Sequence, residues 1–291
     1  YLKLGRPLFL LGGFVFHGLG ILLAVVSGAT FDLPAALLGQ LAITSTQLMT
    51  HYLNEYFDLA ADQANETLSF EARESETLAI VGESGCGKSV TVQSIMGIIP
   101  MPPGKITAGS ALLNGKEILG LPPKEANKFR GVEIGMIFQD PMTSLNPTMT
   151  IGDQIAETLM VHRGVSKQQA SQRAVELLEK THIPEAEKRA KQYPFEFSGG
   201  MLQRAMIAQS LACNPSVLIA DEPTTALDVT IQAQILELML ELQRTENMSI
   251  ILITHDLAVV AKMADRVAVM YAGQVVETGP VDDIFYRSAH P

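Results

Sequence analysis

Residues 82–89 read G-E-S-G-C-G-K-S, which matches the spacing G-x-x-x-x-G-K-S. An apolar, partly β-branched run at 78–81 comes before this motif, and we expect a helix to begin at Lys88. Glycines let the loop turn its N–H groups inward, so the order strand, loop, helix predicts a cradle for phosphate at a helix N-terminus. Lys88 would reach the β- and γ-phosphates, and the Ser89 hydroxyl would bind Mg²⁺. The expected phosphate-binding residues are Gly82, Glu83, Ser84, Gly85, Cys86, Gly87, Lys88, Ser89 and Val90.

Polar side chains also stand where three later apolar runs end. We expect Gln139 to contact Mg²⁺ and the attacking water, and Asp221 to hold Mg²⁺ through water. Glu222 fits the base that polarises the attacking water, and His255 fits a hydrogen-bond partner of a γ-phosphate. Each of these residues alone has a plainer alternative, namely a solvated strand end or a structural histidine.

An α/β arrangement is needed to position these side chains. Ser198, Gly199 and Gly200 would open a further helix whose free N–H groups could hold phosphate, although S-G-G is a weak signal by itself. Ser166 followed by Gln169 is typical of a helix capping box, and Asn114-Gly115 predicts a hairpin turn. We expect strands at 66–70, 78–81, 134–138, 217–222 and 250–253, and helices at 151–161, from 166 onwards, and at 230–244.

Composition limits the class of protein. Of 291 residues, 47% are hydrophobic and 18% are charged, so part of the chain is more apolar than a soluble domain. The net charge is −10 and no basic block occurs, so we expect no nucleic-acid partner. Cys86 and Cys213 lie far apart and match no metal-binding spacing, which indicates a reduced, cytosolic environment.

The first 65 residues have a different character. The segments 7–27 and 34–53 contain no formal charge and are long enough to cross a bilayer, so we expect an α-helical membrane hairpin in residues 1–65. Lys3 and Arg6 precede the first span, which by the positive-inside rule places both ends of the hairpin in the cytoplasm. Everything after Asn54 is then expected to be cytosolic.

An acidic cluster follows the second apolar segment. Glu55, Asp58 and Asp62 fall on one helical face and could hold Mg²⁺ bridged to a diphosphate. This stretch resembles the first aspartate-rich motif of the intramembrane aromatic (UbiA-type) prenyltransferases of quinone biosynthesis, with Glu55 replacing the first aspartate. That family needs a second acidic motif, which nothing downstream provides. An acidic helix end at a membrane surface is the alternative.

Residues 66–291 resemble a second family. The order of phosphate loop, Gln139, S-G-G, strand-D-E, A-L-D and strand-T-H is similar to that of the ATP-binding subunits of ABC transporters. The segments E-F-S-G-G-M, A-D-E-P-T-T-A-L-D-V-T and R-S-A-H-P are similar to the dipeptide and oligopeptide importers of that family. The resemblance implies an ABC-type P-loop NTPase fold with a helical subdomain at about 140–200. It also implies that ATP and Mg²⁺ bind.

The same resemblance implies partners. In this family S-G-G of one subunit closes over ATP held by the phosphate loop of the other, so we expect a homologous ATPase subunit, in a homodimer or heterodimer. On this basis Ser198, Gly199, Gly200 and Asp228 are expected to contribute to nucleotide binding. Transmembrane permease subunits, and indirectly a peptide-binding protein, would complete an importer at the cytoplasmic face of the cell (inner) membrane.

Three departures from the family pattern leave alternatives open. The membrane-type segment 1–65 occupies the place of the first two strands and of the adenine-stacking loop, a C-terminal extension is lacking, and Leu202 replaces a basic residue. The chain is therefore expected to be chimeric. It could instead be a membrane-anchored nucleotide-binding fragment without a transport role, or a prenyltransferase fragment with a passenger domain. ATP turnover and Mg²⁺-diphosphate binding distinguish these alternatives.

Overall fold

The computed structural model describes residues 73, 75–102, 104–225 and 227–289. The predicted membrane hairpin and the prenyltransferase-like motif fall within residues 1–65, which lie outside the described residues, as does the expected strand at 66–70. In the part of the chain that is described, no helix is long and apolar enough to cross a membrane.

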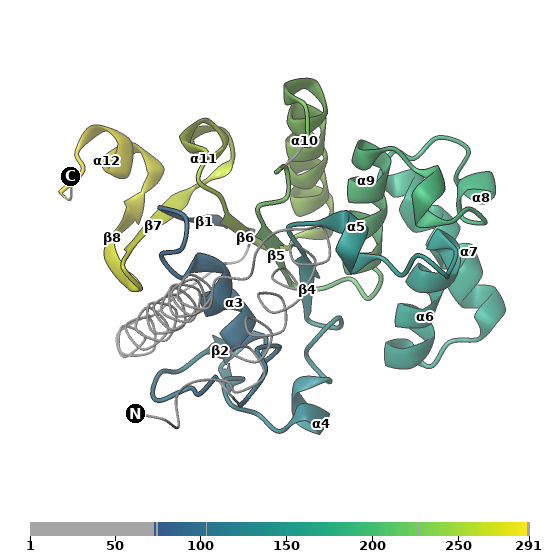
Figure 1. Ribbon diagram of the computed structural model, residues 1–291, viewed down its shortest axis with the longest axis horizontal. Coiled ribbons are helices and arrows are strands. Elements are labelled where there is room, and N and C mark those ends of the chain that lie inside the picture. The colour runs from purple at the N-terminus through teal and green to yellow at the C-terminus, as the bar shows by residue number, and fades with distance from the viewer. Residues whose placement is uncertain (1–72, 74, 103, 226, 290–291) are drawn as a thin grey trace, which may run out of the picture. The chain divides into compact units, whose positions relative to one another are not determined.

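A six-stranded sheet organises the described residues, with the strand order β4-β5-β6-β1-β7-β8 (Figure 1). Five strands run parallel, and β8 pairs with β7 in the antiparallel direction. The strand that enters the phosphate loop, β1, lies between β6 and β7. The strands are β1 Thr77–Gly82, β4 Ile134–Ile137, β5 Val217–Asp221, β6 Ser249–Ile253, β7 Arg266–Tyr271 and β8 Gln274–Pro280.

Helices cover both faces of this sheet, with α3 (Lys88–Ile95) on one side and α10 (Val229–Glu246) and α11 (Leu257–Met263) on the other (Figure 1). Alternate residues of β1 divide between the two layers: Ile80 packs in the core with α3, and Ala79 packs in the core with α11. Because both faces are buried, β1 is a continuous apolar run rather than an alternating one.

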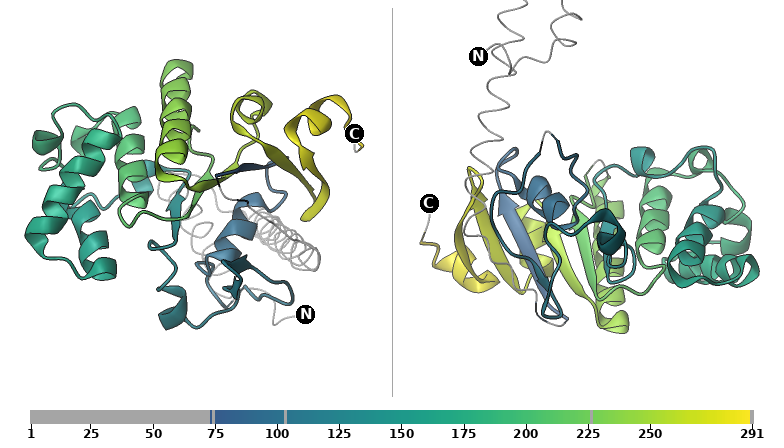
Figure 2. Two further views of the ribbon diagram at one scale, coloured as in Figure 1. Left: turned by 180° about the vertical axis from the view of Figure 1, so that it is seen from behind. Right: turned by 90° about the horizontal axis from the view of Figure 1, so that it is seen from below.

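A cluster of helices lies beyond the β4 edge of the sheet (Figures 1 and 2). Its core includes Ile155, Leu177 and Met206, each from a different helix. The capping box is confirmed, because the Gln169 amide donates to Ser166 Oγ and the Gln169 side chain accepts from the Ser166 amide. The elements are α5 Pro141–Ser144, α6 Ile151–Arg163, α7 Lys167–Lys180, α8 Ala186–Arg189, η2 Pro194–Glu196 and α9 Gly199–Ser210.

Leu202 is 3% exposed within α9 and belongs to the core of this helical cluster. A basic side chain at this position would be desolvated, whereas leucine adds apolar area to the core. The departure from the family pattern therefore agrees with the local packing.

The structure also contains the hairpin turn that Asn114-Gly115 predicts. Asn114 and Gly115 have φ values of 49° and 75°, which a two-residue turn between right-twisted strands requires. The remaining described elements are β2 Leu112–Leu113, β3 Lys116–Glu117, α4 Pro123–Ala126 and α12 Val281–Tyr286.

Gly152 in α6 offers a test of this packing. A Cβ atom there would lie 2.7 Å from the Ala190 carbonyl oxygen, which accepts the Gly152 amide at 2.8 Å. Alanine normally favours a helix over glycine by about 1 kcal/mol, but overpacking against a fixed backbone costs about 1 to 3 kcal/mol. We therefore expect Gly152→Ala to lower the free energy of unfolding by about 1 kcal/mol, measured by urea denaturation. Glu157→Ala, on the exposed face of the same helix, should change it by less than about 0.5 kcal/mol, and a stabilised Gly152→Ala protein would contradict this packing.

Candidate functional site

The loop between β1 and α3 depends on glycine where it leaves the sheet. A Cβ atom on Gly82 would lie 2.1 Å from the Met270 carbonyl oxygen, so no other residue fits beside β7. Gly85 and Gly87 have φ values of 81° and 99°, in the region that favours glycine, and Gly87 forms the N-cap of α3. The predicted strand, glycine loop and helix are thus present at the expected positions.

Lys88 is 5% exposed, and its ammonium group is held by the loop. The Nζ atom donates to the carbonyl oxygens of Gly82 and Glu83, at 2.8 Å each, and lies 3.9 Å from Cys86 Sγ. A buried ammonium requires such partners, and here they fix the cation inside the curve of the loop. That position suits an anion cradled by the loop.

Ser89 and Asp221 meet at the start of α3. The Ser89 hydroxyl donates to Asp221 Oδ1 at 2.8 Å, and Asp221 is 3% exposed. Burial raises the pKa of Asp221, with a further rise from the Glu222 charge, while the Ser89 hydrogen bond and the Lys88 charge oppose it. A hydroxyl beside a carboxylate is the hard oxygen set that Mg²⁺ prefers, so these two residues fit the predicted metal role.

Glu222 lies directly after β5 in an unusual backbone conformation, with a φ of 47°. Its amide donates to the Ile253 carbonyl at 3.0 Å, which fixes the residue against the end of β6. The expected strand 217–222 therefore ends one residue earlier than predicted, because Glu222 turns out of the ladder. Non-glycine residues adopt this region at a cost of roughly 1 to 2 kcal/mol, and such residues concentrate at functional sites.

The Glu222 carboxylate has three side-chain partners. Gln139 Nε2 donates to Oε2 at 3.1 Å, Thr225 Oγ1 donates to the same oxygen at 2.9 Å, and His255 Nδ1 lies 3.1 Å from Oε1. Burial by itself would raise the pKa of Glu222, but the hydrogen bonds from His255 and Thr225, with the charges of His255 and Lys88, lower the pKa overall. The structure thus brings Gln139, Glu222 and His255 together at the carboxyl ends of three parallel strands.

The S-G-G motif lies against the start of α10. Ser198 is the N-cap of α9, and its hydroxyl accepts the Met201 amide at 3.4 Å. A Cβ atom on Gly200 would lie 2.8 Å from Ile231 Cγ2, so this close helix contact also requires glycine. Asp228 caps α10 by accepting the amides of Thr230 and Ile231, at 3.1 and 3.0 Å. A nucleotide role for these residues stays a prediction.

Two features of the site escaped the sequence analysis. Thr225 Oγ1 donates a hydrogen bond to Glu222. The sequence contains one signal for this contact, namely a hydroxyl residue three positions after the acid that ends the apolar run. The turn after β7 also touches the phosphate loop, where the Gly273 amide donates to the Cys86 carbonyl at 3.0 Å. No local signal predicts that second contact, because it joins distant parts of the chain.

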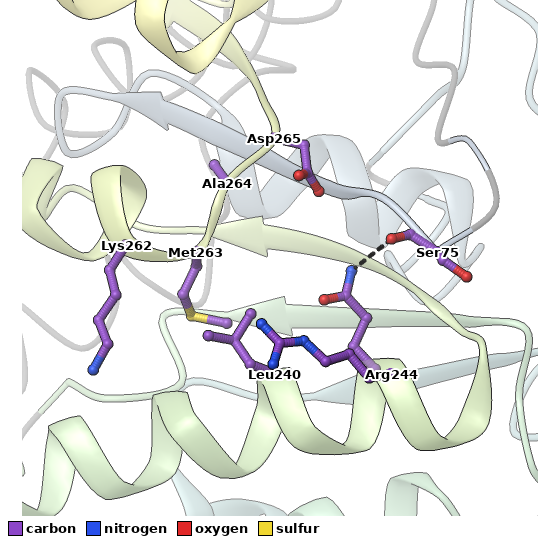
Figure 3. Close-up of a pocket in the computed structure, with 8 residues that line it drawn as sticks. Ser75, Leu240, Arg244, Lys262, Met263, Ala264 and Asp265 are labelled. Carbon is purple, nitrogen blue, oxygen red and sulfur yellow. Dashed lines mark hydrogen bonds between the residues drawn. The ribbon is translucent and has the colours of Figure 1, made fainter.

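A pocket of about 290 Å³ lies away from the side chains of Gln139, Glu222 and His255 (Figure 3). Figure 3 shows it between the ends of α10 and α11 and Ser75, which lies two residues before β1. Because it lies at the amino edge of the parallel strands, it is remote from Glu222 and Lys88, which lie at the carboxyl edge. Its lining residues are Ser75, Leu240, Gln243, Arg244, Lys262, Met263, Ala264 and Asp265.

Comparisons with known proteins agree with this geometry. The family model described as ABC transporter matches residues 65–225. The oligopeptide transport ATP-binding protein OppD of Bacillus subtilis is 64% identical over 79% of this chain and 64% of its own length. The dipeptide transport ATP-binding protein DppD of Bacillus subtilis is 57% identical, over 79% of this chain and 68% of its own length. The chain thus spans about two thirds of the length of these curated relatives.

Solved structures share the fold. A dimeric ATP-binding cassette in a post-hydrolysis state, bound to ADP and Pi, superposes with a TM-score of 0.65 at 30% identity, over 75% of this chain and 90% of its own. The protein cbiO1 from Clostridium perfringens, part of an ABC transporter complex, gives a TM-score of 0.65 at 28% identity, over 77% and 85%.

Lys88→Ala and Glu222→Gln should separate nucleotide binding from hydrolysis. We expect Lys88 to contact phosphate in the ground state. If Lys88→Ala removes two charge-assisted hydrogen bonds to phosphate of about 1.5 kcal/mol each, ATP affinity should weaken by about a hundredfold. Glu222→Gln keeps the shape of the side chain but removes the base, so ATP should bind while turnover falls at least about a hundredfold. Equilibrium dialysis and phosphate release measure the two effects.

The matched controls are Lys167→Ala and Glu241→Gln, two exposed residues outside the site. Both should bind and hydrolyse ATP like the parent chain. Turnover by Glu222→Gln at the parent rate would mean that another residue is the base.

Proposed function

Because this chain belongs to the ABC transporter family, we propose that it is an ATP-hydrolysing subunit that powers the import of dipeptides or oligopeptides. The observation that carries the proposal is the convergence of Gln139, Glu222 and His255 beside a complete phosphate loop. The relatives named above support the choice of peptides as cargo, since they are peptide transport ATP-binding proteins.

Hydrolysis would follow from the positions of the side chains. The loop amides and Lys88 bind the phosphates, and Ser89 and Asp221 would hold Mg²⁺, which when bound supplies positive charge to the β- and γ-phosphates. Glu222 would be ionised at neutral pH, as glutamate ordinarily is, so its carboxylate would accept a proton from the attacking water. The water oxygen bonds to the γ-phosphorus, the bond to the bridging oxygen breaks, and ADP and phosphate leave.

A second ATPase subunit would complete the site. S-G-G opens α9, and its N-terminus would face phosphate bound by the partner, as the family resemblance implies. Val229, next to Asp228, is 82% exposed. We propose that this surface packs against the other subunit; the dimeric structure of the similar cassette supports the proposal.

Permease subunits are the other proposed partners, with a peptide-binding protein acting indirectly. Met142 follows Gln139 by three residues and is 60% exposed, and Phe195 precedes Ser198 by three residues and is 71% exposed. Apolar side chains beside the site suit a protein partner. The chain would then work at the cytoplasmic face of the cell membrane, with residues 66–291 as the ATPase domain and residues 1–65 as the proposed membrane hairpin.

ATP turnover and peptide uptake test this function together. Together with a homologous ATPase subunit, the purified chain should release phosphate from ATP only when Mg²⁺ is present. In vesicles that also contain peptide-importer permease and partner subunits, it should support uptake of a radiolabelled tripeptide, and Glu222→Gln should remove both activities. Turnover without ATP-dependent uptake would support the nucleotide-binding alternative without a transport role, and the absence of Mg²⁺-dependent turnover in the presence of the partner subunits would overturn the ATPase assignment.

A further inference from the structure

We propose that Thr225 is a positioning residue, whose hydroxyl orients the Glu222 carboxylate toward the attacking water. The inference rests on the proposed ATPase function. Thr225 Oγ1 donates to Glu222 Oε2 at 2.9 Å, which is the shortest of the three side-chain contacts of this carboxylate. A hydroxyl donor to a carboxylate is a charge-assisted hydrogen bond, the stronger class of such bonds.

The contact is reinforced by the backbone. The Thr225 amide donates to the Glu222 carbonyl at 3.2 Å, so the main chain closes a turn between the two residues. Glu222 is itself held in the left-handed region by its amide hydrogen bond to Ile253. The hydroxyl and the carboxylate therefore belong to one short turn of the chain, closed by a backbone hydrogen bond.

The other two partners of the Glu222 carboxylate come from parts of the chain that are distant in sequence. Gln139 follows β4 and His255 follows β6, so each reaches the carboxylate from a different strand. Both are also the residues that we expect to turn toward Mg²⁺ and the γ-phosphate when nucleotide binds. Thr225 would then be the donor that still holds Oε2, leaving Oε1 to accept the proton from water.

The same turn continues into α10. The Leu227 amide donates to the Thr224 carbonyl at 3.3 Å, and Asp228 then caps the helix. The orientation of the carboxylate is thus tied to the position of the α10 N-terminus, beside the S-G-G motif. Loss of the hydroxyl frees the carboxylate to rotate without removing any contact that we assign to the phosphates.

The test uses Thr225→Val, which keeps the β-branched shape and removes the hydroxyl, and Thr225→Ser, which keeps the hydroxyl. We expect Thr225→Val to lower kcat about tenfold, equivalent to about 1.4 kcal/mol, with the KM for ATP within about twofold of the parent. Thr225→Ser should stay within about twofold of the parent kcat. Thr224→Val, the adjacent residue, is the matched control and should behave as the parent.

A double-mutant cycle with Glu222→Gln shows whether the hydroxyl acts through the carboxylate. In the Glu222→Gln background, Thr225→Val should change the residual turnover by less than about twofold. A parent-like kcat for Thr225→Val, a higher KM instead of a lower kcat, or an equal loss in both backgrounds would each overturn the inference. If Thr225→Val unfolds at the assay temperature, two measurements decide. Loss of turnover in a folded Thr225→Ser protein would overturn the inference. Parent-like turnover of Thr225→Ser, together with the expected double-mutant cycle measured at a low temperature at which Thr225→Val is folded, would support it. A parent chain that does not hydrolyse ATP contradicts the proposed function instead.

Discussion

The close approach of Gly82 to the Met270 carbonyl determines where the phosphate loop begins. Because the backbones of β1 and β7 leave no room for a Cβ atom, the chain enters the loop at one fixed place on the sheet. The loop carbonyls then hold the Lys88 ammonium, and α3 starts where Ser89 reaches Asp221 on β5. The positions of the loop, of Lys88 and of Ser89 thus follow from one steric constraint between two strands.

The surroundings of two adjacent acids shift their pKa values in opposite directions. Asp221 ends β5 inside the sheet, where burial raises its pKa, whereas Glu222 turns out of the strand, and donors from Gln139, Thr225 and His255 surround its carboxylate. The pKa of Glu222 is lowered despite partial burial. Environments that push the pKa values of two carboxyl groups apart are a common basis for distinct roles, here the proposed roles of a metal partner for Asp221 and a base for Glu222.

Local signals explain how much could be predicted from the sequence. Glycine spacing, the capping box at Ser166 and the Asn114-Gly115 turn depend on residues close in sequence, and the structure contains all three. Gln139, Glu222 and His255 were each expected at the end of an apolar run, and the structure brings them together because the parallel strands end at one edge of the sheet. The Gly82–Met270 contact and the packing of Gly200 on Ile231 could not be predicted, because they depend on the relative placement of whole elements.

The strand order also has a consequence for how the domain forms during synthesis. β4 and β5 can pair as soon as both have left the ribosome, but β1 pairs with β6 and β7, which are translated much later. The apolar β1 strand and the glycine loop therefore remain without their neighbours while most of the domain is being made. Nascent chains in that state expose a hydrophobic segment, and non-local parallel pairing of this kind folds slowly. The β1 strand and the glycine loop are therefore translated before the two strands that flank β1, and their surroundings are completed late.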